Sequence, residues 1–340
     1  MGELTYRDIL QTVLSRGHLS REQTHAAFND IMEGLWSESQ IAGLLVALAA
    51  KGETPEEIAG AAQAMREHAV RIDTGGLDAI DTCGTGGTGL NTFNVSTAAA
   101  MVVAGAGVKV AKHGNRTSTR ASGSADVLAA LGVNIDAPPE AAARCLREAG
   151  VCFCFAVRCH PAMRYAAPVR KSLAVRTIFN VLGPLTNPAG ARRQLMGVFG
   201  ADLTETIARV LGLLGAERAM VVHAEDGLDE LSITGPTRVS EWSGGDVKTR
   251  TVRPEDFGLE RGAMEDLAVD SPEASAEIIR RVLTGESGPA RDMVLLNSAA
   301  ALAVAGLADD IAGGFAPAEN SIKSGSAAEA LDKLIALSNE

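Results

Sequence analysis

After residue 73 the chain alternates between short apolar runs and segments with helical periodicity, and this alternation limits the possible folds more than any other feature. Strands that alternate with helices form βαβ units, so the pattern predicts an α/β fold with a mostly parallel central sheet. The runs predicted as strands are 77–81, 108–111, 151–156, 195–199 and 219–223. The helical patterns between them are 97–105, 124–131, 139–149, 165–173 and 203–214. A hairpin is expected at 239–242 and 247–252, and late packing helices at 293–305 and 326–337.

The first part of the chain has helical periodicity throughout, which predicts a small helical domain over residues 1–72. Capping boxes are predicted at Ser20 with Gln23, Ser37 with Gln40, and Thr54 with Glu57. Apolar faces on so small a unit would either support the larger domain or form a dimer contact, and we favour a homodimer contact. Residues 73–340 are then expected to form the α/β domain, with helices near 173–187 joining the small domain.

The composition argues against several functional classes of protein. The 340 residues carry a net charge of −11, which disfavours a general nucleic-acid binder. Five cysteines without a C-x-x-C pair indicate neither a disulfide framework nor a zinc site. The N-terminus does not read as a signal peptide, and no apolar run reaches the roughly 18 residues that a membrane span needs. These features predict a cytoplasmic enzyme with no membrane partner.

Three segments between residues 81 and 126 are typical of anion binding. The glycine loop 84–87 can close its backbone N–H groups around an anion. The cluster 94–97 stands where a helix should begin, and helix N-termini favour phosphate. The loop 112–116 adds Lys and Arg directly after an apolar run. An ordinary turn, a plain helix cap and a solvated loop are the simpler explanations of the three segments, but together they suit a ligand with several phosphate groups.

Two further sites are indicated at the same edge of the sheet. Asp229 and Glu230 are adjacent carboxylates after an apolar run, an arrangement that suits Mg²⁺ beside phosphates, although a solvated acidic turn would look alike. Arg170 could hold a carboxylate through its guanidinium, although a surface salt bridge is the simpler explanation.

These motifs, taken in order, resemble the anthranilate phosphoribosyltransferase family. The resemblance runs from about residue 5 to the C-terminus, and it rests on segments 84–87, 94–97, 112–116, 122–126, 160–161, 180–188 and 226–230. It implies a small helical domain and a larger α/β domain, as in the pyrimidine nucleoside phosphorylases, and a homodimer. It also implies transfer of the phosphoribosyl group of 5-phosphoribosyl 1-pyrophosphate (PRPP) to the amine of anthranilate in tryptophan biosynthesis.

The resemblance assigns roles by position. For PRPP it implies Gly84, Gly87, Thr88, Thr92, Asn94, Val95, Ser96, Thr97, Lys112, His113, Gly114, Asn115, Arg116, Thr119, Arg120 and Ser124. For anthranilate it implies Gly84, Asn115 and Arg170, with Met163 and Pro184 along the entry path. Two Mg²⁺ ions would be held, one by Ser96 and Glu230 and one by Asp229 and Glu230. A neutral aromatic amine attacks without a strong base, so no residue is assigned as a general base.

The sequence departs from the family pattern at two places. Thr88 stands where the family usually has Asp, and Thr119-Arg120-Ala121 stands where it usually has a Ser-Ser pair and often a basic residue. One alternative is therefore a catalytically weak or inactive relative that binds nucleic acid or another ligand in the same cleft. A phosphorolytic nucleoside enzyme is a third possibility, although the 112–116 loop and the Asn115/Arg170 pair resemble the anthranilate enzymes more.

Overall fold

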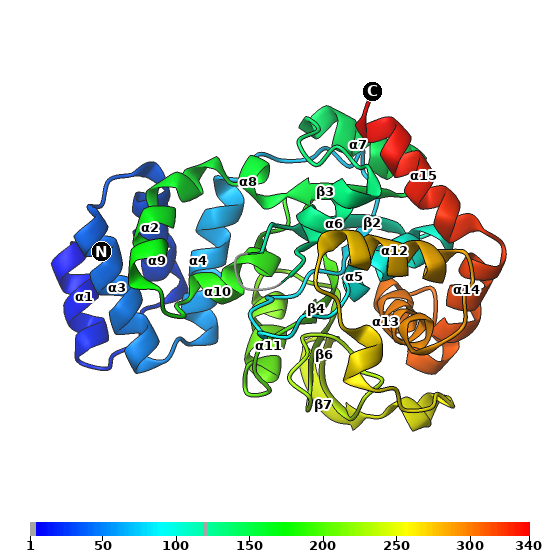
Figure 1. Ribbon diagram of the computed structural model, residues 1–340. Coiled ribbons are helices and arrows are strands. Elements are labelled where there is room, and N and C mark those ends of the chain that lie inside the picture. Colours follow the sequence, from blue (N-terminus) through cyan, green and yellow to red (C-terminus); the bar gives the residue numbers. More distant parts are fainter. Residues whose placement is uncertain (1–4, 118–120) are drawn as a thin grey trace.

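The computed structural model describes residues 5–117 and 121–340, and Figure 1 shows a helical bundle at one end joined to a larger α/β part. The bundle contains α1 (Tyr6–Leu14), α2 (Arg21–Glu33), α3 (Glu38–Lys51) and α4 (Pro55–Glu67). The predicted architecture, a small helical domain followed by an α/β domain, is confirmed.

The bundle helices begin where the capping residues predict. Ser20, Ser37 and Thr54 each accept a hydrogen bond from the backbone N–H three residues later, and the side chain at that position bonds back. Thr5 forms the same motif at the start of α1. Glu57 does more than close its capping box, because its carboxylate is fully buried and pairs with Lys51 Nζ at 2.8 Å. It also accepts the backbone N–H of Leu19 at 3.0 Å and thereby ties the loop before α2 to α4.

Within the described residues the central sheet has seven strands in the order β3-β2-β1-β4-β5-β6-β7. The first five strands of that order pair in parallel, and β5, β6 and β7 pair antiparallel, so the sheet is mostly parallel as predicted. The strands are β1 (Ala79–Asp81), β2 (Lys109–Gly114), β3 (Val151–Phe155), β4 (Arg193–Gly197), β5 (Arg218–Ala224), β6 (Thr237–Ser243) and β7 (Asp246–Val252).

Strand β2 differs from the expectation in a way that matters for the site. The apolar run predicted a strand that ends at residue 111, but β2 continues to Gly114 because it pairs with the whole of β3, up to Gly114 opposite Phe155. Lys112 and His113 therefore lie in a strand and not in a loop. A hydropathy pattern does not show the true end of this strand, because the apolar run stops at residue 111 while backbone pairing with β3 continues through polar residues.

Helices cover both faces of the sheet, with α5, α13 and α15 packed together on one face and α11 on the other. The helices of this part are α5 (Val95–Gly105), α6 (Ser124–Leu131), α7 (Pro139–Glu148), α8 (Ala156–Cys159), α9 (Ala167–Leu173), α10 (Phe179–Leu182), α11 (Leu203–Leu213), α12 (Pro272–Leu283), α13 (Pro289–Ala305), α14 (Ile311–Lys323) and α15 (Ser326–Ser338). Short 3₁₀ helices are η1 (Pro161–Tyr165), η2 (Gly183–Thr186), η3 (Pro254–Phe257) and η4 (Met264–Leu267). The sequence pattern missed α12 and α14, and α14 contains Pro317, which normally signals a break.

The two faces of the sheet pack against two separate apolar cores. In β5, Met220 and Val222 face the core that contains α5 and α13, while Ala219 and Val221 face a second core. That second core also contains the buried side chains of the bundle, the apolar residues of α11, and residues of α9, α10 and η2. The bundle and one face of the sheet therefore share a single continuous core, because alternate strand residues point to opposite faces.

We expect Glu57→Ala to lower the free energy of unfolding by about 3 kcal/mol, because among the described residues it removes the only acceptor of the Leu19 N–H and the carboxylate that pairs with the buried Lys51 ammonium, which keeps only neutral partners. Chemical denaturation of the full chain measures this loss. The matched control is Glu56→Ala, an exposed neighbour in the same turn, which should change stability by no more than about 0.5 kcal/mol. Equal stability of the two variants would contradict the role assigned to Glu57.

Candidate active site

The glycine loop follows β1 directly and is fixed by contacts to two neighbouring segments. Gly86 and Gly87 have φ angles of +64° and +76°, in the left-handed region that glycine adopts without strain. Thr85 donates its N–H to the Gly197 carbonyl at 2.9 Å, and Gly86 donates its N–H to Asp229 Oδ2 at 2.8 Å. A Cβ on Gly84 would lie 2.6 Å from that same carboxylate oxygen, so a glycine there makes room for the acidic side chain. The structure thus brings the glycine loop and Asp229 together.

The start of α5 lies in the same region. Asn94 is the N-cap residue, but its side chain does not cap the helix. Its amide oxygen instead accepts the hydroxyls of Ser122 at 2.6 Å and Ser275 at 2.8 Å. Thr97 Oγ1 is buried without a hydrogen-bond partner among the described residues. The first turn of α5 therefore lacks a side-chain cap, which leaves its N–H end suited to an anion.

Lys112 supplies a buried positive charge at this position. Its side chain is only 2% exposed, and its Nζ donates to the Thr82 carbonyl at 3.2 Å and to Ser96 Oγ at 3.1 Å. No Asp or Glu of the described residues forms an ion pair with it. A buried ammonium group held only by neutral oxygens favours a negatively charged ligand beside it.

The segment after β2 is only partly described. Ser124 donates its hydroxyl to the Asn115 carbonyl at 3.3 Å, which closes the loop onto the start of α6. A Cβ on Gly114 would lie 2.1 Å from Ser124 Oγ, so the close approach requires glycine. Arg116 Nη1 pairs with Asp126 Oδ1 at 2.9 Å, and its side chain is 57% exposed. The predicted residues Thr119 and Arg120 lie outside the described residues.

His113 faces another histidine. Its Nε2 lies 3.2 Å from His160 Nε2, and both rings are buried. Burial lowers the pKa of His113 to about 3, with a smaller contribution from His160, and burial lowers the pKa of His160 to about 4. Both rings are neutral at physiological pH, so His113 adds no positive charge to the site.

The acidic loop after β5 is held in place by two polar side chains. Asp226 accepts the Leu228 N–H at 2.9 Å and the Ser232 hydroxyl at 2.5 Å. Asn297 on α13 accepts the Leu231 N–H at 3.0 Å and donates to its carbonyl at 2.8 Å. Asp229 is thereby placed against the glycine loop, and the hard oxygens of a carboxylate at this position fit Mg²⁺.

A second group of possible metal ligands fits less well. Asp81, Cys83 and His113 bring ligand atoms within 4.8 Å of one another. Both oxygens of Asp81 are already engaged, one by the His113 N–H at 3.1 Å and one by Asn187 Nδ2 at 2.7 Å. Burial and the charge of Asp81 raise the pKa of the Cys83 thiol, which disfavours the thiolate that a soft metal needs. We interpret this group as structural.

Arg170 lies on α9, with its Cζ 5.3 Å from the centre of the Phe179 ring. Its guanidinium forms no ion pair with an acidic residue in the described part of the chain. A charged guanidinium without an acidic partner can take a carboxylate from a ligand.

The sequence pattern missed three residues that shape the site. Asp81 and Asn187 join β1, β2 and the η2 segment, since Asn187 Nδ2 also donates to the Ala111 carbonyl at 2.7 Å. The sequence did offer a signal for Asp81, because it is a single acidic residue at the end of an apolar run. Arg176 donates from its guanidinium to the Gly87 carbonyl at 2.9 Å, and no local pattern pointed to it.

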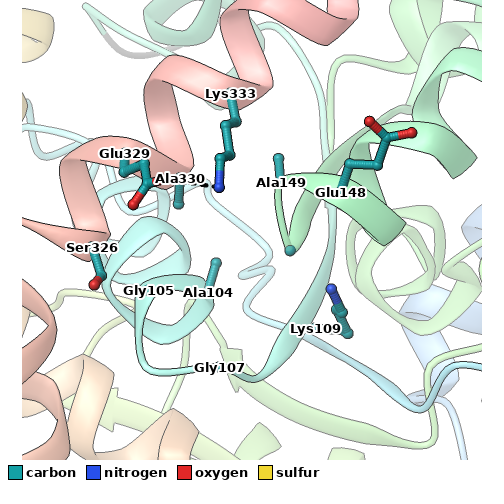
Figure 2. Close-up of a pocket in the computed structure, with 11 residues that line it drawn as sticks. Ala104, Gly105, Gly107, Lys109, Glu148, Ala149, Ser326, Glu329, Ala330 and Lys333 are labelled. Atoms are coloured by element: carbon teal, nitrogen blue, oxygen red, sulfur yellow. Dashed lines mark ion pairs between the residues drawn. The ribbon is translucent and has the colours of Figure 1, made fainter.

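A polar cavity of about 230 Å³ lies elsewhere, between α5, α7 and α15 (Figure 2). It opens near Lys109, at the start of β2, and so lies at the opposite end of the strands from the glycine loop. Its two lysines have partners: Lys333 pairs with Glu329 at 2.8 Å, and Lys109 donates to the Arg147 carbonyl at 2.8 Å. The chemistry-bearing residues lie at the carboxyl ends of the strands instead, where α/β sheets bind ligands.

Within the described residues, no helix is both long and apolar enough to cross a membrane.

Both parts of the chain match known protein families. Residues 7–69 match the glycosyl transferase family, helical bundle domain, and residues 76–328 match the glycosyl transferase family, a/b domain. The anthranilate phosphoribosyltransferase of Moorella thermoacetica is 52% identical over 327 residues, which are 96% of this chain and 96% of that protein.

Solved structures extend the comparison to three dimensions. The crystal structure of anthranilate phosphoribosyltransferase from Thermus thermophilus has a TM-score of 0.93 and 43% identity, and it covers 98% of this chain and 100% of that chain. The Saccharomyces cerevisiae enzyme in complex with PRPP and Mg has a TM-score of 0.88 and 30% identity, with 99% of each chain covered. The yeast enzyme is also known in complex with 4-fluoroanthranilate. The resemblance drawn from the motifs is confirmed, and the chain belongs to the anthranilate phosphoribosyltransferase family.

Proposed function

We propose that this protein transfers the 5-phosphoribosyl group of PRPP to the amine of anthranilate, giving N-(5-phosphoribosyl)-anthranilate and pyrophosphate in tryptophan biosynthesis. The observation that carries the proposal is the buried Lys112 ammonium, which has no acidic partner in the described part of the chain and lies beside Ser96 at the start of α5. Such a charge needs an anion, and the adjacent glycine loop and helix N-terminus offer further donors to phosphate.

In the proposed reaction the bond between the anomeric carbon and the pyrophosphate oxygen breaks, and a bond from the amine nitrogen to that carbon forms. Lys112 and the backbone N–H groups of the glycine loop stabilise the charge that develops on the leaving pyrophosphate. Arg170 and Asn115 hold the anthranilate carboxylate and so aim the amine at the anomeric carbon. The amine loses its proton to solvent after attack, so no protein base is required.

We propose that two Mg²⁺ ions assist, one on Ser96 and Glu230 and one on Asp229 and Glu230. When bound, the ions would neutralise phosphate charge that Lys112 alone cannot balance. The buried position of Asp229 under the glycine loop supports this assignment. The remaining PRPP contacts expected at Thr88, Thr92, Val95, His113 and Arg116 stay predictions.

We expect anthranilate fluorescence to decay when purified protein is mixed with PRPP and MgCl₂, because the amine becomes substituted. Omission of PRPP, omission of metal, or addition of EDTA should each abolish the decay. A folded protein that gives no decay under the complete conditions would favour the weak or inactive relative, and a salt-dependent gel shift would then test nucleic acid as its ligand.

We expect Arg170→Ala to raise the KM for anthranilate at least about tenfold and the KM for PRPP less than about twofold, since only the carboxylate contact is lost. Steady-state kinetics with each substrate varied in turn measures both values. Lys171→Ala, an exposed neighbour on the same helix, is the control and should leave both values unchanged. Equal effects of Arg170→Ala on the two KM values would rule out the assigned role.

We also propose that the enzyme is a cytoplasmic homodimer that associates through the helical bundle. The five cysteines are free and buried, as is usual in a reducing compartment. The bundle exposes the large apolar side chains of Leu14 at 61% and Leu35 at 66%, and a contact between two bundles would remove them from water.

We expect sedimentation velocity to give twice the chain mass of 35.2 kDa for the wild type and the single-chain mass for Leu35→Glu, which places a charge in the proposed contact. Leu307→Glu, at an exposed apolar residue outside the bundle, is the control and should remain dimeric. A wild-type protein that sediments as a monomer would refute the proposed dimer.

A further inference from the structure

Arg176 bridges the two parts of the molecule at the glycine loop. The residue follows α9, a helix whose Val169 packs in the core that the bundle shares with α11. Its Nη2 donates to the Gly87 carbonyl at 2.9 Å, and its Cζ lies 4.3 Å from the centre of the Phe199 ring, just beyond β4. A guanidinium can do both because it is planar, with donors at its edge and a face that stacks on an aromatic ring.

The backbone before Arg176 is shaped for this contact. Ala174, the residue that ends α9, has φ of +52° and ψ of +25°, a left-handed conformation that is uncommon for residues other than glycine. Two residues later the side chain reaches the glycine loop, and Thr177 then donates its N–H to Asn180 Oδ1 at 2.9 Å, which fixes the start of the next turn. The turn that places Arg176 is therefore fixed on both sides.

The contact decides the orientation of one peptide unit. Gly86 donates its N–H to Asp229, and Gly87 offers its carbonyl to Arg176, so the loop is held by two different side chains at successive residues. In a planar trans peptide the carbonyl and the following N–H point in opposite directions. With the Gly87 carbonyl turned toward Arg176, the Thr88 N–H points away from it. Glycines at positive φ rotate easily, so without Arg176 this peptide could turn over.

We propose that Arg176 is a positioning residue that locks the 84–88 loop in its phosphate-binding conformation and links that loop to the helix that carries Arg170. The proposal rests on the proposed function for the identity of the phosphate ligand, but the lock itself is a property of the free protein. Arg176 acts through the loop backbone. Because Arg170 lies on α9 and Arg176 follows closely after it, a shift of α9 on acceptor binding would reach the loop through the Gly87 contact.

The test compares the wild type with Arg176→Gln and Arg176→Lys in the full chain. Hydrogen exchange of the ligand-free protein should show amides of residues 84–90 exchanging about tenfold faster in the Gln variant, because one charge-assisted hydrogen bond is lost. The KM for PRPP should rise about tenfold, with a melting temperature within about 2 °C of the wild type because Arg176 is exposed. The Lys variant keeps a donor but not the planar face, so its exchange should lie between the two.

The control is Arg192→Gln, an exposed arginine at the opposite end of β4 that pairs with Glu217 at 2.5 Å. It should leave loop exchange and the KM for PRPP unchanged. Unchanged loop exchange in Arg176→Gln, or faster exchange throughout the protein with a lower melting temperature, would overturn the proposal. If the wild type fails to transfer the phosphoribosyl group while the exchange difference persists, the proposed reaction is wrong and the positioning role stands.

Discussion

The ammonium group of Lys112 imposes the main constraint on this site. It is buried at the end of a parallel strand and is satisfied only by a carbonyl and a hydroxyl oxygen. Taking a charge out of water is costly, and in this protein the nearby Asp81 offsets part of that cost from beyond ion-pair distance. Burial in turn raises the pKa of Asp81 to about 6. The buried charge of Lys112 is therefore balanced only in part by its neighbours, which is the feature on which the proposed phosphate site rests.

Much of this organisation could be predicted because it follows local rules. Capping boxes marked the bundle helices, short apolar runs marked the strands, and glycine, lysine and acidic segments after those runs marked the ligand edge. The contacts that join distant segments could not be predicted. The hydrogen bond from Arg176 to Gly87 spans 89 positions, and the one from Asn187 to Asp81 spans 106. No periodicity encodes such pairs, since the fold alone brings them together.

Small residues in this site are required by neighbouring backbone and carboxylate groups. A Cβ on Gly197 would lie 1.7 Å from the Asp229 carbonyl oxygen, and a Cβ on Gly84 would lie 2.6 Å from the Asp229 carboxylate. The glycine loop and the end of β4 therefore both approach Asp229 at contact distance. The position of Asp229 depends on the hydrogen bonds that Asp226 and Asn297 make within the acidic loop. If Asp229 moved, the hydrogen bond from the Gly86 N–H to its carboxylate would also be lost.

The core shared by the bundle and the α11 face of the sheet has a consequence for how the molecule can move. Apolar side chains of α2, α4, η2, α11 and β5 pack in one core, so the two parts are not independent domains joined by a flexible linker. Sliding of α4 along α11 is the type of motion that would keep this packing intact. Because Val169 of α9 belongs to this shared core, a displacement of the bundle would also act on the segment that carries Arg176 and its hydrogen bond to Gly87.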